Sequence, residues 1–196
     1  MLSHESDLAY LTRIQPEPPA LLLELEQQGR YDGVPVVERA TGRFLSTLVH
    51  AMQANRVLEV GTAYGGSTLW MALALPPAGH IWTIDPDRKR TTVALEFMER
   101  AGKKSAVDVI NQPALEILNA STLHNLDIIF IDADIPLYLK YLELCVPMLK
   151  RSGLVVVDDL LNPEAESFNR TFLAHPNLDA TIIPLGKGVG IGARIA

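Results

Sequence analysis

The 196-residue sequence has a single cysteine, Cys145, and no apolar run long enough to cross a bilayer. One cysteine cannot form an internal disulfide, so we expect no disulfide scaffold and a reducing, cytoplasmic environment. Aspartate and glutamate outnumber lysine and arginine by 23 to 17, giving a net charge of −6. The chain therefore lacks the excess positive charge typical of a broad nucleic-acid surface. Its first residues lack a basic region followed by an apolar stretch, so we expect no signal peptide.

Zinc-binding patterns are also absent, because the five histidines are scattered and only one cysteine is present. Aromatic residues are few, but hydrophobic residues make up 48%, an ordinary share for a folded protein. A chain of this length forms one domain and buries about 70% of its unfolded surface. We expect an N-terminal helical segment over residues 1–32, followed by an α/β core over residues 33–196.

From residue 56 onward, short apolar runs alternate with helical patterns. Strands are predicted at 56–61, 80–85, 107–111, 126–133, 153–159, 181–185 and 189–195. Helices are predicted at 3–14, 19–29, 41–54, 67–75, 88–101, 114–119, 137–149 and 164–174. Strand–helix alternation predicts a mostly parallel, Rossmann-like sheet with helices on both faces. The last two strands, joined by Gly186-Lys187-Gly188, predict a hairpin that contributes one antiparallel strand.

A glycine-containing turn follows the first strand of this core. Glu59 lies two residues before Gly61, Gly65 follows, and a helical pattern begins near Ser67. Glycines let the backbone turn sharply and approach a ligand, and free amides at a helix start suit an anionic group. The spacing is not G-x-G-x-x-G, so a nicotinamide dehydrogenase is the weakest interpretation.

Acidic residues follow nearly every strand of the core, namely Asp85, Asp132, Asp134, Asp158 and Asp159. Each one alone could cap the following helix. As a set they indicate a site, because ligands of open α/β sheets bind beyond the carboxyl ends of the strands. Oxygens converging from two strand ends favour a hard cation such as Mg²⁺, Ca²⁺ or Mn²⁺.

The ordered motifs resemble those of the cation-dependent O-methyltransferases of the catechol and caffeoyl-CoA type. They are Glu59-Val-Gly-Thr-Ala-Tyr-Gly65, Thr83-Ile-Asp85-Pro-Asp87, Asp127-Ile-Ile-Phe-Ile-Asp132-Ala-Asp134 and Val155-Val-Val-Asp158-Asp159. The resemblance runs from about Gly33 to the C-terminus. It implies the class I methyltransferase fold and S-adenosylmethionine as the cofactor.

The resemblance also implies site residues and partners. The cofactor would be held by Val37, Glu59, Gly61, Thr62, Gly65, Ser67, Asp85, Ala114 and Asp132. A divalent cation would be held by Asp132, Asp158 and Asp159. The methyl acceptor would be a small, catechol-like molecule, and a homodimer is expected, for which the apolar stripe Leu21–Leu25 is a candidate interface.

Three positions depart from the family pattern. Ile135 stands where the family has the lysine thought to act as general base, and isoleucine cannot move a proton. Asp159 replaces an asparagine, and Gln112-Pro113 replaces Gly-Asp beside the expected adenine site. Lys140 or Lys187 could substitute for the missing lysine, although both are interpreted as solvated surface side chains. No catalytic residue is assigned.

Three hypotheses remain open at the level of sequence. The first is a metal-assisted O-methyltransferase acting on a small hydroxyl compound. The second is a cofactor-binding homologue with altered catalysis, given Ile135 and Pro113. The third is a tRNA-modifying methyltransferase of the same fold, against which the acidic composition argues.

Overall fold

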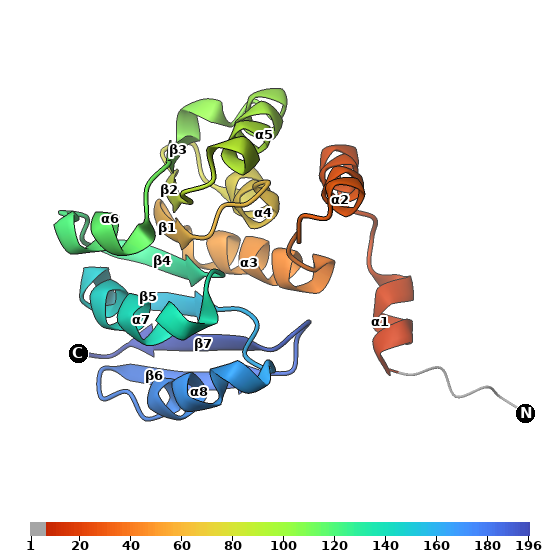
Figure 1. Ribbon diagram of the computed structural model, residues 1–196. Coiled ribbons are helices and arrows are strands. Elements are labelled where there is room, and N and C mark those ends of the chain that lie inside the picture. The colour runs from red at the N-terminus through yellow and green to blue at the C-terminus, as the bar shows by residue number, and fades with distance from the viewer. Residues whose placement is uncertain (1–6) are drawn as a thin grey trace, which may run out of the picture.

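The computed structural model describes residues 7–196 (Figure 1). The strands are β1 Arg56–Val60, β2 His80–Ile84, β3 Val107–Ile110, β4 Leu126–Ile131, β5 Leu149–Val157, β6 Leu178–Ile183 and β7 Val189–Arg194. The α-helices are α1 Asp7–Ile14, α2 Ala20–Asp32, α3 Arg39–Met52, α4 Gly66–Ala74, α5 Arg88–Arg100, α6 Ala114–Ala120, α7 Tyr138–Cys145 and α8 Glu166–Leu173. The expected helix at 3–14 thus begins outside the described residues.

The seven strands form one sheet in the order β3-β2-β1-β4-β5-β7-β6. Strands β3 to β5 pair in parallel, and β7 lies antiparallel to both β5 and β6. The predicted seven-stranded sheet with one antiparallel strand is confirmed. The chain runs outward from β1 to β3 and then returns to place β4 on the other side of β1. This reversal is the switch point where open α/β sheets bind ligands.

Alternate side chains of the strands face two separate apolar layers. In β4, Ile128 and Phe130 pack with α2, α3, α4 and α5, whereas Ile129 and Ile131 pack with α6, α7 and α8. Every residue of β4 is buried, as its continuous apolar sequence predicts for a central strand. Cys145 is also fully buried and unpaired.

The N-terminal helices differ from each other in their packing. Leu22 and Leu25 of α2 are 1% and 0% exposed and belong to the core of the same chain. The stripe Leu21–Leu25 therefore packs within the chain, and it does not offer the dimer interface that the sequence suggested. Helix α1 lies apart from the body in Figure 1, with Tyr10, Leu11 and Ile14 about half exposed.

Two predicted elements have different bounds for identifiable reasons. The helix expected at 137–149 ends at Cys145, and a 3-10 turn at Val146–Met148 follows, because Pro147 lacks the N–H that would continue the α-helix. Strand β5 begins at Leu149 and not at residue 153, so at its N-terminal end it is longer than the sequence predicted. Within residues 7–196, no helix has the length and apolar character needed to cross a membrane.

Candidate active site

A cavity of about 570 Å³ lies beyond the carboxyl ends of β1, β2, β4 and β5. Its wall includes nine residues that the sequence placed at a site: Val37, Gly61, Thr62, Ser67, Asp85, Ala114, Asp132, Asp158 and Asp159. Residues from six separate segments therefore meet in one cavity, at the switch point between β1 and β4.

Gly61 joins the two sides of this cavity. It has a φ of +102°, and a Cβ atom there would lie 1.9 Å from the backbone oxygen of Asp132. The Gly61 N–H bonds to the Ile84 oxygen at 2.9 Å, and the Asp132 N–H bonds to the Val60 oxygen at 2.9 Å. Only glycine combines this backbone conformation with so close an approach.

Glu59 is fully buried behind the wall of the cavity and does not line it. Its carboxylate accepts hydrogen bonds from Ser67 Oγ at 2.5 Å, Thr83 Oγ1 at 2.6 Å and the hydroxyl of Thr68. Burial raises the pKa of Glu59 to about 7, although these hydroxyl donors oppose the rise. The direct cofactor contact expected of Glu59 is thus corrected to a contact with Ser67, which does line the cavity.

Gly65 is a second correction, because it too does not line the cavity. It has a φ of +81° and caps α4 at its N-terminus, where an added Cβ would meet the Cβ of Ala94 at 2.9 Å. Gly65 therefore allows the turn and the contact with α5, and it presents Gly66 and Ser67 to the cavity.

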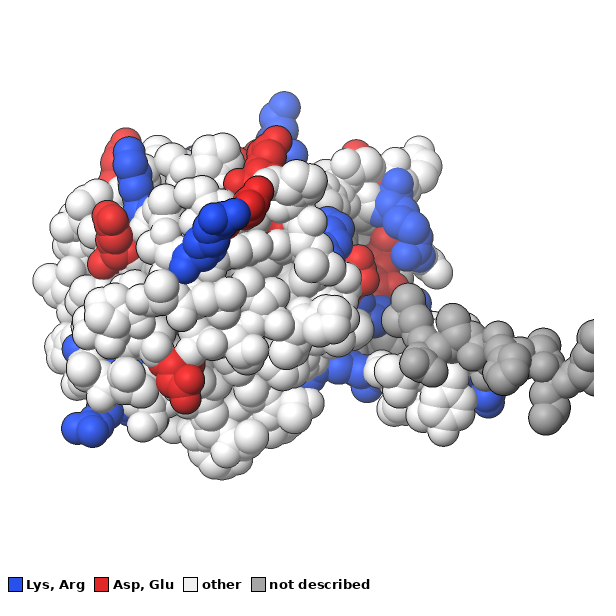
Figure 2. All heavy atoms as spheres, turned by 90° about the horizontal axis from the view of Figure 1, so that it is seen from below, with Lys and Arg blue, Asp and Glu red and all other residues white. Residues whose placement is uncertain are grey.

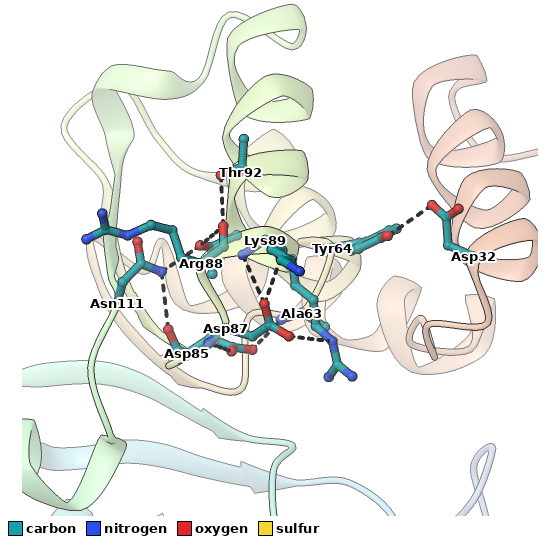
Figure 3. Close-up of polar contacts among 11 residues, drawn as sticks. Asp32, Ala63, Tyr64, Asp85, Asp87, Arg88, Lys89, Thr92 and Asn111 are labelled. Atoms are coloured by element: carbon teal, nitrogen blue, oxygen red, sulfur yellow. Dashed lines mark hydrogen bonds and ion pairs between the residues drawn. The ribbon is translucent and has the colours of Figure 1, made fainter.

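Asp85 is held by the backbone on both sides (Figure 3). Its Oδ2 accepts the Ala63 N–H at 2.8 Å, and its Oδ1 accepts the Asp87 N–H at 2.8 Å. Each carboxylate oxygen has capacity for a further hydrogen bond beyond this backbone donor, and the residue lines the cavity. The side chain is therefore fixed in place and can accept further hydrogen bonds from a pair of hydroxyl groups.

Asp87 combines two tasks. It caps the N-terminus of α5, because its Oδ1 accepts the N–H groups of Lys89 and Arg90 at 2.9 and 3.2 Å. It also lines the cavity, together with Arg90, whose Nε lies 3.3 Å from Asp87 Oδ2. No sequence pattern indicated this second role of Asp87.

An apolar wall forms where an adenine ring was expected. Ala114 lines it, flanked by Pro113 and Leu115, with Leu137 and Tyr141 from the segment after β4. Pro113 precedes α6 as its N-cap residue, a position that needs no N–H inside the helix. The departure from the family pattern at Pro113 is therefore compatible with the local fold.

Three carboxylates gather at the β4–β5 end. Burial, with the charges of Asp158 and Asp159, raises the pKa of Asp132 to about 7. Burial also raises the pKa of Asp158 to about 6, and the Asp158 Oδ1 accepts the Asp159 N–H at 2.9 Å. Asp159 has a φ of +62°, an unusual backbone conformation that aspartate and asparagine tolerate better than most residues.

Lys187 is the cation at this end of the cavity. Its Nζ lies 3.3 Å from Asp159 Oδ1. Partial burial works against its charge, but Asp159 first, then Asp132 and Asp158, outweigh this and raise the pKa of Lys187. The interpretation of Lys187 as a solvated surface residue is therefore incomplete, because this exposed side chain also lines the cavity and is paired with Asp159.

The predicted metal ligands were tested against this geometry. Their oxygens are of the kind that Mg²⁺, Ca²⁺ or Mn²⁺ prefers. However, within residues 7–196 no three histidine, cysteine, aspartate or glutamate side chains are grouped so that they could hold a metal ion. One oxygen of Asp159 faces the Lys187 ammonium, and one of Asp158 accepts a backbone N–H. The carboxylates, as arranged, do not fit a divalent cation.

The position of the missing general base is apolar. Ile135 is partly buried and packs against the core formed with α6, α7 and α8. Lys140 lies on the exposed side of α7 and is not among the residues of the cavity wall. Of the two lysines considered as substitutes, the fold brings only Lys187 to the site.

Comparison with known proteins identifies the family of the chain. Residues 20–195 match the O-methyltransferase family. A catechol O-methyltransferase of Mycobacterium tuberculosis is 34% identical over 160 residues, covering 75% of this chain and 73% of that protein. The solved structure of a putative O-methyltransferase from Klebsiella pneumoniae is 30% identical with a TM-score of 0.87, covering 95% of each chain.

A further solved structure, an O-methyltransferase from Streptomyces achromogenes in complex with S-adenosylmethionine, is 25% identical with a TM-score of 0.86, again covering 95% of each chain. Both the fold and the cavity at the switch point are those expected of such an enzyme. The chain belongs to the O-methyltransferase family and is an S-adenosylmethionine-dependent O-methyltransferase.

Proposed function

We propose that the enzyme methylates a hydroxyl group of a small, catechol-like aromatic molecule. The observation that carries this proposal is a second hollow of about 510 Å³ beside the cavity, lined by Asp159, Leu161, Asn162, Pro163 and Lys187. It shares Asp159 and Lys187 with the first cavity. A ligand there would have apolar contacts from Leu161 and Pro163 and a polar group at the shared wall, as small-molecule sites commonly do.

The roles of the cavity residues follow from their positions. Asp85 would accept hydrogen bonds from the ribose hydroxyls of the cofactor, and the apolar wall around Ala114 would contact the adenine. Ser67, at the start of α4, would meet the methionine part, where free N–H groups favour its carboxylate. Asp132 would then lie near the positively charged sulfonium. In this pose the transferred methyl group points toward the β4–β5 end.

The metal assistance that the resemblance implies is not part of the proposed mechanism. A bound divalent cation would polarise the acceptor hydroxyl. The carboxylates of this chain do not fit it as they are arranged, since Lys187 pairs with Asp159. Rate acceleration is instead assigned to holding acceptor and methyl group together, an effect worth up to about 7–11 kcal/mol.

Two experiments test this proposal. Calorimetric titration with S-adenosylmethionine, with NAD⁺ as the control ligand, should show binding of the methyl donor alone. Transfer of labelled methyl from the donor to 3,4-dihydroxybenzoate should then exceed transfer to 4-hydroxybenzoate, which lacks the neighbouring hydroxyl. Donor binding without transfer to any hydroxylated aromatic compound would contradict the proposed acceptor.

That negative outcome would support a second candidate, a cofactor-binding homologue with altered catalysis. The observation that favours it is the packing of Ile135 against the core, which leaves no base at that position. The two candidates share the same donor affinity and differ in turnover. A single methylation per enzyme molecule without later turnover would also distinguish a homologue with altered catalysis from an enzyme that turns over repeatedly.

The tRNA-modifying alternative has less support. The face drawn in Figure 2 carries basic and acidic side chains interspersed with a large uncharged area. Phosphate backbones bind to clustered lysine and arginine, and such binding weakens steeply with salt. Methyl transfer to unmodified tRNA, lost between 50 and about 200 mM salt, would favour this alternative. The homodimer and the cytoplasmic location remain predictions, the latter consistent with the unpaired Cys145.

A further inference from the structure

We propose that the Lys187 ammonium takes the place of a divalent cation at the acceptor end of the cavity, where it contacts the acceptor oxygen and makes methyl transfer independent of metal. This inference rests on the proposed function, because it assigns the group that neutralises the acceptor. Lys187 acts only through its positive charge, and its side chain stays protonated throughout the reaction.

The first argument is charge. Three carboxylates meet at this end, and Lys187 interacts with all three, through an ion pair with Asp159 and through the charges of Asp132 and Asp158. A divalent cation bound to the same oxygens would lie next to this ammonium. Like charges at such a short distance repel each other, and the repulsion from a divalent ion is twice that from a monovalent one. The lysine and the metal therefore compete for one position.

The second argument is that the backbone holds Lys187 at this place. The Lys187 oxygen accepts the Leu161 N–H at 2.8 Å, and the Gly188 oxygen accepts the Leu160 N–H at 3.0 Å. These bonds tie the β6–β7 connection to the segment directly after Asp159. Gly188 has a φ of +93°, and a Cβ atom there would lie 2.6 Å from Leu161 Cγ. The lysine is thus a fixed part of the site and not the tip of a free hairpin.

The third argument is access. Lys187 lines both the cofactor cavity and the neighbouring hollow, and 60% of its side chain is exposed. An ammonium group has three donors, so the ion pair with Asp159 leaves others for a ligand. The only other cation among the described residues of the cavity wall, Arg90, pairs with Asp87 at the β2 end. Lys187 is therefore the side chain placed to meet an oxygen of the acceptor.

The reaction balances without a metal. The acceptor hydroxyl gives its proton to water in the open cavity, and its oxygen forms a bond to the methyl carbon of S-adenosylmethionine. The bond between that carbon and sulfur breaks, and its electron pair stays on sulfur, giving S-adenosylhomocysteine. The Lys187 ammonium stabilises the negative charge on the acceptor oxygen as the proton leaves.

The test compares wild type with Lys187→Met, Lys187→Arg and the control Lys140→Met, whose lysine lies on the exposed side of α7. Mn²⁺ binding is measured by electron paramagnetic resonance, and methyl transfer to 3,4-dihydroxybenzoate is measured with and without EDTA. We expect wild type to keep its turnover in EDTA and to bind Mn²⁺ only at about 1 mM or weaker, since the ammonium opposes the ion.

In Lys187→Met, the turnover number should fall by at least about 10-fold, while donor affinity stays within about 2-fold. The same variant should bind Mn²⁺ at least about 10-fold more tightly than wild type, because its carboxylates are freed. Lys187→Arg should keep most of the turnover, and Lys140→Met should match wild type in every measurement.

Tight Mn²⁺ binding by wild type, inactivation by EDTA that Mg²⁺ reverses, or full turnover in Lys187→Met would each overturn the inference. Failure of wild type to bind S-adenosylmethionine, or to methylate any hydroxylated aromatic compound, would instead count against the proposed function. In that event the Mn²⁺ comparison still decides the inference, which equal binding by wild type and Lys187→Met would refute.

Discussion

Carboxylates at the two ends of the cavity are stabilised by different kinds of partner. At the β1–β2 end, Glu59 accepts three hydroxyl donors and Asp85 accepts two backbone N–H groups. At the β4–β5 end, Asp132 and Asp158 have raised pKa values, to which the charge of Asp159 contributes. Burial also raises the pKa of Glu59, but the carboxylates of the first end have donors supplied by the fold, whereas three carboxylates crowd together at the second end with Lys187 as their cation.

This difference matches the chemistry expected at each end. A cofactor that forms many neutral hydrogen bonds needs groups fixed before it arrives, because a preorganised site loses less entropy on binding. Methyl transfer from a sulfonium to an acceptor oxygen changes the charge on both atoms. Negative carboxylates attract the sulfonium, and a cation stabilises the negative charge on the acceptor oxygen. In the proposed mechanism the β1–β2 end would bind the cofactor, and the β4–β5 end would face the acceptor.

The largest expected effect comes from Gly61, which lies between the two ends. Gly61→Ala places a Cβ atom 1.9 Å from the Asp132 backbone oxygen, at a φ of +102°. We expect a loss of about 3–5 kcal/mol in the free energy of unfolding and at least about 100-fold weaker donor binding, as the β1 loop separates from β4. Chemical denaturation and calorimetry measure the two effects.

The matched control is Gly33→Ala. Gly33 also has a positive φ, +68°, but nothing lies within 4 Å of its added Cβ. Gly33→Ala should lower the free energy of unfolding only through backbone strain, by about 1–2 kcal/mol, and should leave donor binding intact. Similar losses in the two variants would mean that backbone conformation alone, and not the contact with Asp132, makes Gly61 necessary.

Most of the fold could be predicted from the sequence, because apolar runs and turns have local signals. The seven strands, the single antiparallel strand and the burial of β4 all followed from patterns within a few residues of each strand, whereas the order of the strands in the sheet did not. The ends of elements were less predictable, since Pro147 ended α7 earlier than periodicity indicated. Such ends depend on single residues within a pattern that otherwise continues.

The site was predictable where the chain order fixes it and not where distant segments meet. Asp85, Asp132 and Asp158 follow directly from their strands, so their place at the cavity was expected. The pairing of Lys187 with Asp159 was not predicted, because the two residues are 28 positions apart in the sequence and no pattern links them. Glu59 was predicted to contact the cofactor directly, because a strand sequence does not show that Ser67 lies between Glu59 and the cavity.

A smaller effect should distinguish the two ends through pH. Burial raises the pKa of Glu59 from 4.5 to about 7, so the folded state holds this proton more tightly than the unfolded state. The resulting stabilisation is complete below pH 4.5 and is lost as the pH rises to about 7. Glu59→Gln should remove about 1–3 kcal/mol of this decline, seen in urea denaturation between pH 5 and 8.

Asp127→Asn provides the control of opposite sign, at the other end of β4. Although burial opposes it, the Lys150 ammonium and the N–H groups of Arg56 and Asn55 lower the pKa of Asp127. Its stabilisation is therefore present above its ordinary pKa and lost as the pH falls through the lowered value. A steeper decline in Glu59→Gln than in wild type would show that Glu59 is ionised in the fold at low pH.

The smallest effect comes from making the same substitution at each end. Asp85→Asn puts an amide NH₂ against the N–H of Ala63 or of Asp87 and should cost about 1–2 kcal/mol of stability. Asp159→Asn keeps a side chain that tolerates a φ of +62° and removes one of three crowded charges. The lost pair with Lys187 is largely exposed and worth less than about 1 kcal/mol.

Asp159→Asn should therefore change stability by less than about 1 kcal/mol, with the sign favouring the variant at pH 8 and the wild type at pH 5. The reason is that Asp132 and Asp158, with pKa values of about 7 and 6, are ionised only at the higher pH. Exposed Asp134→Asn is the control and should show no such dependence. A loss in Asp159→Asn as large as that in Asp85→Asn would mean that the β4–β5 carboxylates are as firmly satisfied as those at the β1–β2 end.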